Sequence, residues 1–269
     1  MLRSLSDLEK YSVSATDGDI GKVVDFLLDD HRWVVRYLVV ETGGFLGERR
    51  VLISPISFRD ADWSSQRFHV ALTVDTVNHS PSVDTDQPVS GQHEREHFRY
   101  YGYSPYWADS GLWGAGSFPG PLGSGARAPS VPPAPSSTPP RGDSHLRSAN
   151  EVRGYHVLGN EEPVGHIEDF VLDDSTWAVQ YLVIDTSNWW FGKKVLVSPT
   201  WARGISYEDR RVYVDMSRQM IKDCPEWDMN AAVNREYETR LYDYYGRPVY
   251  WAGDRPELAP KRDPSPPRL

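Results

Sequence analysis

Five consecutive residues have the spacing of a zinc hydrolase motif. His93-Glu94-Arg95-Glu96-His97 matches His-Glu-x-x-His, in which two histidines one helical turn apart hold Zn²⁺ and the glutamate is the general base. A catalytic zinc needs a third protein ligand, but Tyr103 stands where the extended motif has a histidine, and no glutamate follows His97 until Glu151. We therefore favour a solvated, charged helical turn over a zinc-dependent hydrolase, and expect no metal, cofactor or catalytic residue.

The elements around this motif belong to a module that occurs twice, at a constant offset of 144 positions. Residues 21–30 (GKVVDFLLDD) correspond to residues 165–174 (GHIEDFVLDD), and further matches are Val51–Pro55 with Val195–Pro199, Tyr100–Gly102 with Tyr244–Gly246, and Tyr106–Ala108 with Tyr250–Ala252. So long a match indicates a duplication. A catalytic set of the module should recur in both copies, yet Tyr237 and Leu241 replace His93 and His97.

Charge and cysteine content restrict the classes of partner and compartment. The chain of 269 residues has 38 acidic and 29 basic residues, a net charge of -9, which disfavours nucleic acid and anionic membrane surfaces. The single cysteine, Cys224, allows no internal disulfide. The first residues lack the apolar core of a signal peptide, and no stretch approaches the roughly 20 apolar residues of a membrane-spanning helix. The sequence predicts a cytoplasmic protein without an integral membrane segment.

The hydrophobic pattern predicts an all-β fold. Short runs rich in Val, Ile, Phe, Tyr and Trp are separated by Gly, Asp, Asn and Ser, which is typical of strands and turns. We expect strands near residues 20–28, 34–41, 49–53, 56–60 and 67–73, and again 144 positions later. Closure removes exposed sheet edges, so the expected architecture is two tandem small antiparallel β-barrels.

Composition also predicts the domain boundaries. Tyr, Gly and Pro in the arms that follow each barrel disfavour regular helix at Tyr100-Tyr101 and Tyr244-Tyr245, and we expect the arms to strap across the neighbouring barrel. Gly, Pro, Ser and Ala dominate the segment between the copies. The expected parts are a first barrel (1–82), a helical and aromatic arm (83–108), a flexible linker (109–148), a second barrel (149–228), a second arm (229–253) and a disordered tail (254–269).

Two repeated acids lie inside expected strands. Asp25 and Asp169 are equivalent in the two copies, and an acid within a strand is disfavoured and needs a partner if it is buried. We expect each to have a structural role, through a hydrogen bond to a neighbouring loop. The Asp29-Asp30 and Asp173-Asp174 pairs are expected in hairpin turns, where their side chains bond nearby backbone amides.

Large aromatic residues in loops are the candidates for binding a partner. Trp189-Trp190-Phe191 forms one loop and Phe45-Leu46 occupies the matching place in the first copy. Loops are usually polar, so these side chains either anchor a partner or are buried between the barrels. Trp and Tyr carry much of the energy of interfaces, and the arms add Tyr101, Trp107, Tyr245 and Trp251 to the candidates.

The order of these motifs resembles the photosynthetic reaction centre barrel (PRC-barrel) family. The resemblance lies in a Gly before a strand, an Asp within it, an apolar stretch ending in paired Asp, a Tyr-Leu-Val strand, and an apolar-Ser-Pro segment, over residues 5–82 and 149–228. It implies a small all-β barrel used for protein interaction, without catalytic residues of its own. The chain lacks the membrane helix of the reaction centre H subunit and the N-terminal domain of the related ribosome maturation factor.

The sequence thus favours a non-enzymatic, cytoplasmic interaction or assembly module built from two barrels. The expected partners are proteins, with the two barrels forming an intramolecular pseudo-dimer or the chain forming a homo-oligomer. One alternative is a role like that of the H subunit, which caps a membrane complex, with Asp25, Asp169 and the Asp pairs assisting proton movement. Ribosome maturation and zinc-dependent hydrolysis are the remaining alternatives.

Overall fold

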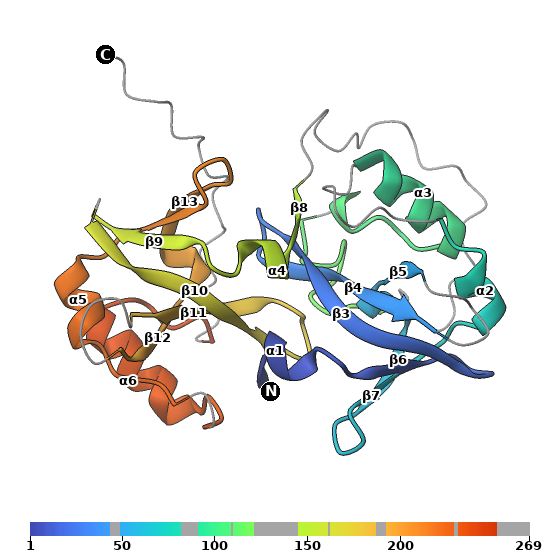
Figure 1. The fold of residues 1–269 in the computed structure, drawn as a ribbon, viewed down its shortest axis with the longest axis horizontal. Helices are drawn as coiled ribbons and strands as arrows, with labels where there is room; N and C mark the ends of the chain where they lie inside the picture. The colour runs from blue at the N-terminus through green and yellow to red at the C-terminus, as the bar shows by residue number, and fades with distance from the viewer. Residues whose placement is uncertain are drawn as a thin grey trace, which may run out of the picture. The chain divides into compact units, whose positions relative to one another are not determined.

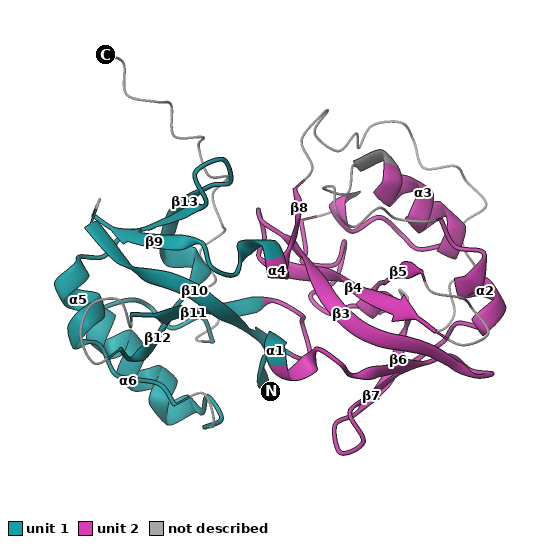
Figure 2. Ribbon diagram, viewed as in Figure 1, with its two compact units in different colours: residues 1–6, 151–173, 179–269 teal, residues 7–150, 174–178 magenta. Residues whose placement is uncertain are grey.

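The computed structural model divides into two compact units, neither of which is one continuous stretch of chain (Figure 2). Unit 1 contains Met1–Ser6, Glu151–Asp173 and Val179–Leu269, and unit 2 contains Asp7–Asn150 and Asp174–Ala178. The structure describes residues 1–43, 49–81, 91–108, 110–120, 145–160, 162–186, 192–228 and 231–251.

Unit 2 is a sheet with strand order β5-β4-β3-β2-β7-β6, to which β8 adds by pairing with β3 (Figure 1). Its strands are β2 (Ser12–Ser14), β3 (Asp19–Asp29), β4 (Val34–Thr42), β5 (Arg50–Ile53), β6 (Phe58–Asp62), β7 (Arg67–Val70) and β8 (Leu146–Ser148). Its helical elements are η2 (Pro55–Ser57), α2 (Val74–Asn78), α3 (Gly91–Tyr101) and η3 (Tyr106–Ala108).

Unit 1 repeats this plan, with strand order β12-β11-β10-β9-β14-β13 and with β1 paired to β10. Its strands are β1 (Leu2–Ser4), β9 (His156–Gly159), β10 (Glu162–Asp173), β11 (Val179–Asp185), β12 (Lys194–Val197), β13 (Ala202–Ser206) and β14 (Arg211–Val214). Its helices are η5 (Pro199–Trp201), α5 (Arg218–Asp223) and α6 (Arg235–Tyr245), while α1 (Leu5–Leu8) and α4 (Ala149–Val152) each lie at a boundary between units.

The mostly β fold is confirmed, with two sheets of seven strands each. The expectation of purely antiparallel pairing is wrong at one place in each unit, because β2 pairs with β7, and β9 with β14, in parallel. The sequence pattern did not predict β2 or β9, which are short. Among the described strands the pairing order is open: its two end strands, β5 and β6 in unit 2 and β12 and β13 in unit 1, are not paired with each other.

Each repeat begins with a short strand that joins the sheet of the other repeat. Strand β1 of the first repeat joins the sheet of unit 1, and strand β8 of the second repeat joins the sheet of unit 2. Residues Leu2–Ser4 pair with Val171–Asp173 of β10, and residues Leu146–Ser148 pair with Leu27–Asp29 of β3. The hairpin tip Asp174–Ala178 also belongs to unit 2, where the ring of Trp177 packs edge-on against Phe58 at 5.2 Å. The repeats therefore exchange short segments.

An irregularity common to both units shapes the long strand at the centre of each sheet. The register shifts between Val23 and Asp25 in β3 and between Ile167 and Asp169 in β10, and such a bulge re-aims the side chains beside it. Just before the bulge, the backbones of β3 and β4 lie very close together. A Cβ on Gly21 would come within 2.0 Å of the Glu41 carbonyl oxygen. Only glycine fits there, and Gly165 has the same constraint against Asp185.

Two expectations about the arms are wrong: the absence of regular helix at the Tyr-Tyr pairs, and the packing of the first arm across the neighbouring barrel. Helices α3 and α6 continue through Tyr101 and Tyr245 and end at Gly102 and Gly246, whose φ angles are +69° and +61°, the left-handed conformation that terminates helices. The first arm packs within its own unit: Tyr103 and Trp107 lie against a cluster with Leu27, Tyr37, Val39, Leu52, Phe98, Tyr106 and Leu146. Tyrosine is tolerated in these helices because tertiary burial of the rings outweighs its modest propensity.

Part of the predicted linker, residues 110–120 and 145–148, lies within the described residues. Trp113 is buried, and its indole Nε1 donates to the Thr176 carbonyl at 2.8 Å. Residues 146–148 form β8. Residue 109 and residues 121–144 of the predicted linker lie outside the described residues, as does the predicted tail from residue 254 onward. No helix in the described ranges has the length and apolar character needed to cross a membrane.

Candidate functional site

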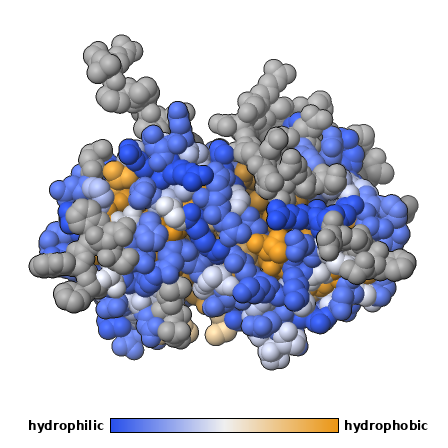
Figure 3. Space-filling model, viewed as in Figure 1, coloured by the Kyte–Doolittle hydropathy of each residue, from blue (hydrophilic) through white to orange (hydrophobic). Residues whose placement is uncertain are grey.

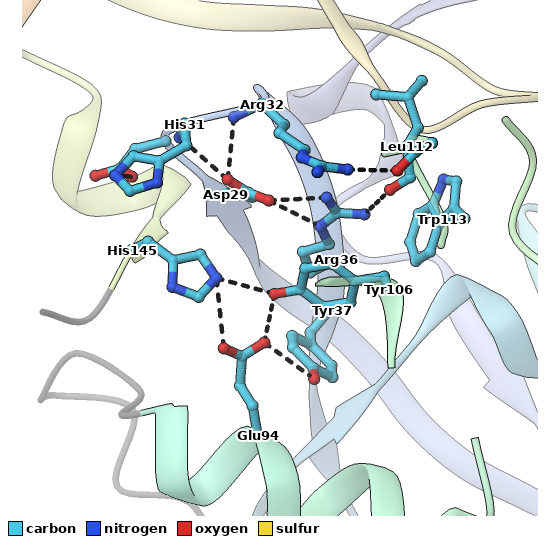
Figure 4. A network of polar contacts seen from close by, with 12 residues as sticks. Asp29, His31, Arg32, Arg36, Tyr37, Glu94, Tyr106, Leu112, Trp113 and His145 are labelled. Carbon is cyan, nitrogen blue, oxygen red and sulfur yellow. Dashed lines mark hydrogen bonds and ion pairs between the residues drawn. The ribbon is translucent and has the colours of Figure 1, made fainter. Parts of the chain in front are cut away.

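Unit 2 contains a buried ion pair at the end of the β3–β4 hairpin (Figure 4). The Arg36 guanidinium donates to Asp29 Oδ2 through Nη2 at 2.8 Å and Nε at 3.1 Å, and both side chains are at most 3 % exposed. Asp29 Oδ1 accepts hydrogen bonds from the amides of His31 and Arg32, both at 3.0 Å. Burial alone raises the pKa of Asp29, but Arg36, His145 and the backbone amide of Arg32 together outweigh burial and hold that pKa below its ordinary value. The pair is ionised.

Tyr106 of η3 and the residues Leu112 and Trp113 that follow it complete the enclosure of this arginine. Arg36 Nη1 donates to the Leu112 carbonyl at 2.5 Å, and the guanidinium carbon lies 3.7 Å from the centre of the Tyr106 ring and 4.9 Å from that of Trp113. The face of an aromatic ring attracts a cation, more strongly when water is excluded. The turn containing Gly111–Trp113 thus has a structural role, which its Gly-rich composition did not reveal.

A second buried cluster joins helix α3, strand β4 and the arm (Figure 4). Glu94 Oε1 accepts from the Tyr106 hydroxyl at 2.6 Å and from the Tyr37 hydroxyl at 3.4 Å. His145 Nε2 lies 3.0 Å from the same Tyr106 hydroxyl and 3.5 Å from Glu94 Oε2. We call Tyr37, Glu94 and Tyr106 the carboxylate clamp of unit 2, because one glutamate fixes both tyrosines.

The same clamp occurs in unit 1, at the offset of 144. Glu238 Oε1 accepts from the hydroxyls of Tyr181 at 2.7 Å and Tyr250 at 2.8 Å. The neighbouring cation differs: Arg235 Nη1 lies 3.0 Å from Glu238 Oε2, and its guanidinium lies 4.0 Å from the Trp251 ring centre. The duplication thus preserves one glutamate and two tyrosines in contact with each other. Applying the offset to Glu94 identifies Glu238 and is the signal that could have found the clamp.

Burial perturbs the titration of the unit 2 clamp. Desolvation raises the pKa of Glu94 to about 7, against the hydrogen bond from Tyr106 that favours the carboxylate. Desolvation also lowers the pKa of His145, while nearby Asp29 opposes that change. The pKa values of Tyr37 and Tyr106 are raised well above their ordinary value, chiefly by burial. Glu94 is thus a carboxyl group that binds its proton near neutral pH.

The zinc motif is not solvated, so the sequence interpretation of this helical turn is wrong. Glu94 and His97 are each 1 % exposed, and His97 Nε2 lies 3.0 Å from the Leu52 carbonyl oxygen, to which it donates. Burial lowers the pKa of His97 to about 4, which leaves a neutral ring within the core. In the described part of the chain, no group of three His, Cys, Asp or Glu side chains could hold a metal ion.

The carboxylate of each clamp is enclosed by protein. Glu238 is 2 % exposed, close to the value for Glu94, and catalysis requires that a substrate reach the acid or base within hydrogen-bond distance. The aromatic candidates of the arms lie nearby. Tyr245 is buried against Trp201, Trp107 packs on Phe98, and Tyr101 stacks on Tyr103 at 5.5 Å. Their rings contact their own unit.

The surface formed by the described residues exposes few large apolar side chains. In Figure 3 the described residues on the face shown are mostly hydrophilic, with hydrophobic residues in small patches. The exposed large hydrophobic residues in the described ranges are Met1, Tyr100, Phe118, Met220 and Tyr244. The predicted partner-binding residues Phe45, Leu46, Trp189, Trp190 and Phe191 lie outside the described residues.

Asp25 and Asp169 hold the exchanged strands. Asp25 accepts from the Ser148 hydroxyl at 2.5 Å and the Asn150 amide at 3.1 Å. Asp169 accepts from the hydroxyls of Ser4 and Ser6, from the Ser6 amide at 3.3 Å, and from Arg153 at 3.0 Å. Each acid thus binds the end of an incoming strand and the start of the following helix, where backbone amides lack partners.

Replacing Asp25 with alanine should weaken the attachment of β8. The change removes acceptors for the Ser148 hydroxyl and Asn150 amide, at a cost of about 1–3 kcal/mol. Hydrogen exchange should show faster labelling of residues 146–150. The control is Asp62→Ala, which removes a carboxylate bonded to Ser64 and Ser65 in another turn. Equal labelling of residues 146–150 in Asp25→Ala and the unsubstituted protein would contradict the role of Asp25.

Comparison with known proteins gives a family and one relative. Residues 2–70 and 145–220, together more than half of the chain, match the PRC-barrel domain model. An uncharacterised protein of Deinococcus radiodurans is 26 % identical over 94 residues, which cover 32 % of this chain and 33 % of that protein. The alignment thus spans about a third of the relative's length. On the two matched segments, the chain belongs to the PRC-barrel domain family and contains the domain twice.

Proposed function

We propose that the chain is a non-enzymatic, cytoplasmic protein-interaction or assembly module, whose two PRC-barrel repeats act as an intramolecular pseudo-dimer. The exchange of first strands carries this proposal, because β1 completes the sheet of the second repeat and β8 that of the first. Strand addition supplies backbone hydrogen bonds, and flanking side chains supply specificity. The proposal includes the closure of each barrel and the repeat boundaries 1–82 and 149–228.

The placement of the polar residues supports a non-enzymatic role. The constellation that the duplication preserves, one glutamate with two tyrosines, is buried in both units. It attaches each helix and aromatic arm to a central strand. The arms therefore have defined positions within their units, and we propose the loops that contain Phe45 and Trp189 as the partner-binding loops.

Cleavage between the repeats tests the pseudo-dimer. A protease site inserted within residues 125–140 should yield two fragments that stay together, because residues 1–6 belong to the unit of the second repeat and residues 145–150 to that of the first. The nicked protein should elute in size-exclusion chromatography at the volume of the intact chain, and denaturant should separate the fragments. Two separate folded fragments under native conditions would refute the pseudo-dimer.

The second candidate is a role like that of the H subunit, capping a membrane complex and assisting proton transfer. The observation that favours it is the Glu94–His145 pair, because the carboxyl has a pKa of about 7. Cofractionation with photosynthetic membranes would support this role, and a non-photosynthetic source would exclude it. Association with ribosomal particles would support a role in ribosome maturation. Stoichiometric zinc in the purified protein would support zinc-dependent hydrolysis.

A further inference from the structure

We propose that the β1 segment of one chain also pairs with β10 of a second chain, so that the protein dimerises by strand exchange. We call Met1–Ser6 and His145–Asn150 the two donor segments, and β10 and β3 their acceptors. The inference rests on the proposed function, since the exchange seen within one chain defines the contacts. It goes further by naming the partner as a second copy of this chain.

The two donor segments have the same chemistry. Both strands read Leu-Arg-Ser, and their registers are equivalent: Leu2 faces Asp173 as Leu146 faces Asp29. Both serines bond to an acid at the same position of the acceptor, Ser4 to Asp169 and Ser148 to Asp25. The structure thus contains a self-recognition motif in two occurrences, and every further copy of the chain brings the same donors.

The donors differ in how firmly they are anchored. In unit 2, Leu146 is 1 % exposed within the hydrophobic cluster, and His145 lies 3.5 Å from the clamp residue Glu94. In unit 1, Leu2 and Arg3 are half-buried and the Met1 side chain is 80 % exposed. Local opening is easiest where few apolar contacts are broken. The β1 donor is therefore the one that we expect to leave its acceptor and enter that of another chain.

The protein concentration determines whether β1 pairs with β10 of its own chain or with β10 of a second chain. A donor that moves to a second chain makes the same backbone and side-chain contacts as within its own chain, which is why segment exchange is a low-cost route to dimers. The remaining difference is the effective concentration of the donor near its own acceptor, of the order of mM for flexible tethers. Raising the protein concentration during opening and closing should shift the population towards dimers.

Disulfide trapping of the register pair Leu2–Asp173 provides the experiment. Both side chains are half-buried, and their Cα atoms are direct antiparallel partners, at a spacing that a disulfide can bridge. The background is Cys224→Ser, since serine stands at the equivalent position 80. Full-length Leu2→Cys and Asp173→Cys chains are mixed, refolded from denaturant together and oxidised. A mixture of Leu2→Cys with Glu208→Cys, at an exposed position outside the register, is the control.

The expected result is a disulfide-linked heterodimer on non-reducing gels. Its yield should rise several-fold over roughly a hundredfold increase in protein concentration during refolding, and it should exceed that of the control at each concentration. Equal yields in both mixtures would overturn the inference. The double variant Leu2→Cys/Asp173→Cys, oxidised at low concentration, separates this failure from that of the proposed function. If it forms an intrachain disulfide, only exchange between chains is refuted; if it does not, the β1–β10 pairing on which both proposals rest is refuted.

Discussion

Arg36→Ala is expected to lower the free energy of unfolding by about 3–5 kcal/mol, because it leaves the Asp29 carboxylate buried without its charged partner. The substitution also removes the cation over the Tyr106 ring and the donor to the Leu112 carbonyl. Equilibrium unfolding in urea measures the loss. The region after η3 should respond as well, and faster hydrogen exchange at residues 110–116 would report its release.

Two further variants make this expectation specific to the ion pair. In Asp29→Asn/Arg36→Gln both charges are gone, the new side-chain amide at position 29 can still accept from the backbone amides of His31 and Arg32, and glutamine is the residue of the second repeat at position 180. This double variant should be more stable than Arg36→Ala. Arg67→Ala breaks a more exposed pair with Asp19 and should cost less than about 1 kcal/mol. A similar loss in Arg36→Ala and Arg67→Ala would show that burial does not set the energy.

Glu94→Gln is expected to stabilise the protein at neutral and higher pH. The native pKa of Glu94, about 7, lies above the ordinary value of 4.5, so the folded state binds this proton more tightly than the unfolded state. The contribution of Glu94 is full below about pH 4.5 and is lost as the pH rises through 7. The difference amounts to about 3 kcal/mol. The substituted glutamine side chain has no such loss and can still accept from both tyrosines.

Parallel urea titrations at pH 4.5 and 7.5 measure this effect, since the other titrating groups are common to both proteins. The stability of Glu94→Gln relative to the unsubstituted protein should rise between the two pH values. Glu238→Gln is the matched variant in unit 1, where the substitution removes the charge partner of Arg235 and should lower the stability at pH 7.5. A constant difference between Glu94→Gln and the unsubstituted protein across this range would contradict a titration of Glu94.

Much of the fold could be predicted from local sequence. The alternation of apolar residues predicted β3, β4, β5, β6 and β7 to within a few residues. Each of these strands is either long or separated by a short turn from a strand with which it pairs, so hydrophobic pattern and turn residues are enough to locate it. The offset of 144 then predicted their counterparts. It also paired Asp25 with Asp169, and the structure shows both acids in contact with exchanged segments.

The candidate site was harder to predict, because its character depends on burial. His93, Glu94 and His97 lie in a helix whose sequence is mostly polar up to His97, and local pattern alone predicts a solvated turn. The Tyr106 ring, the His145 ring and the Leu52 carbonyl come from segments far apart in the chain. They exclude water from this side of the helix, which changes a zinc-like motif into a structural carboxylate and a neutral histidine.

The sequence by itself determined that this protein is one strand-rich module present twice, since the repeat requires only a comparison of the chain with itself. Only the tertiary structure decided which repeat each first strand completes. Leu2–Ser4 and Leu146–Ser148 are three-residue strands whose identical sequences carry no information about the choice of acceptor. The acceptors also resemble each other, since Asp25 and Asp169 hold equivalent serines. The choice therefore depends on the folded chain, because a short strand gains its stability from the sheet that it joins.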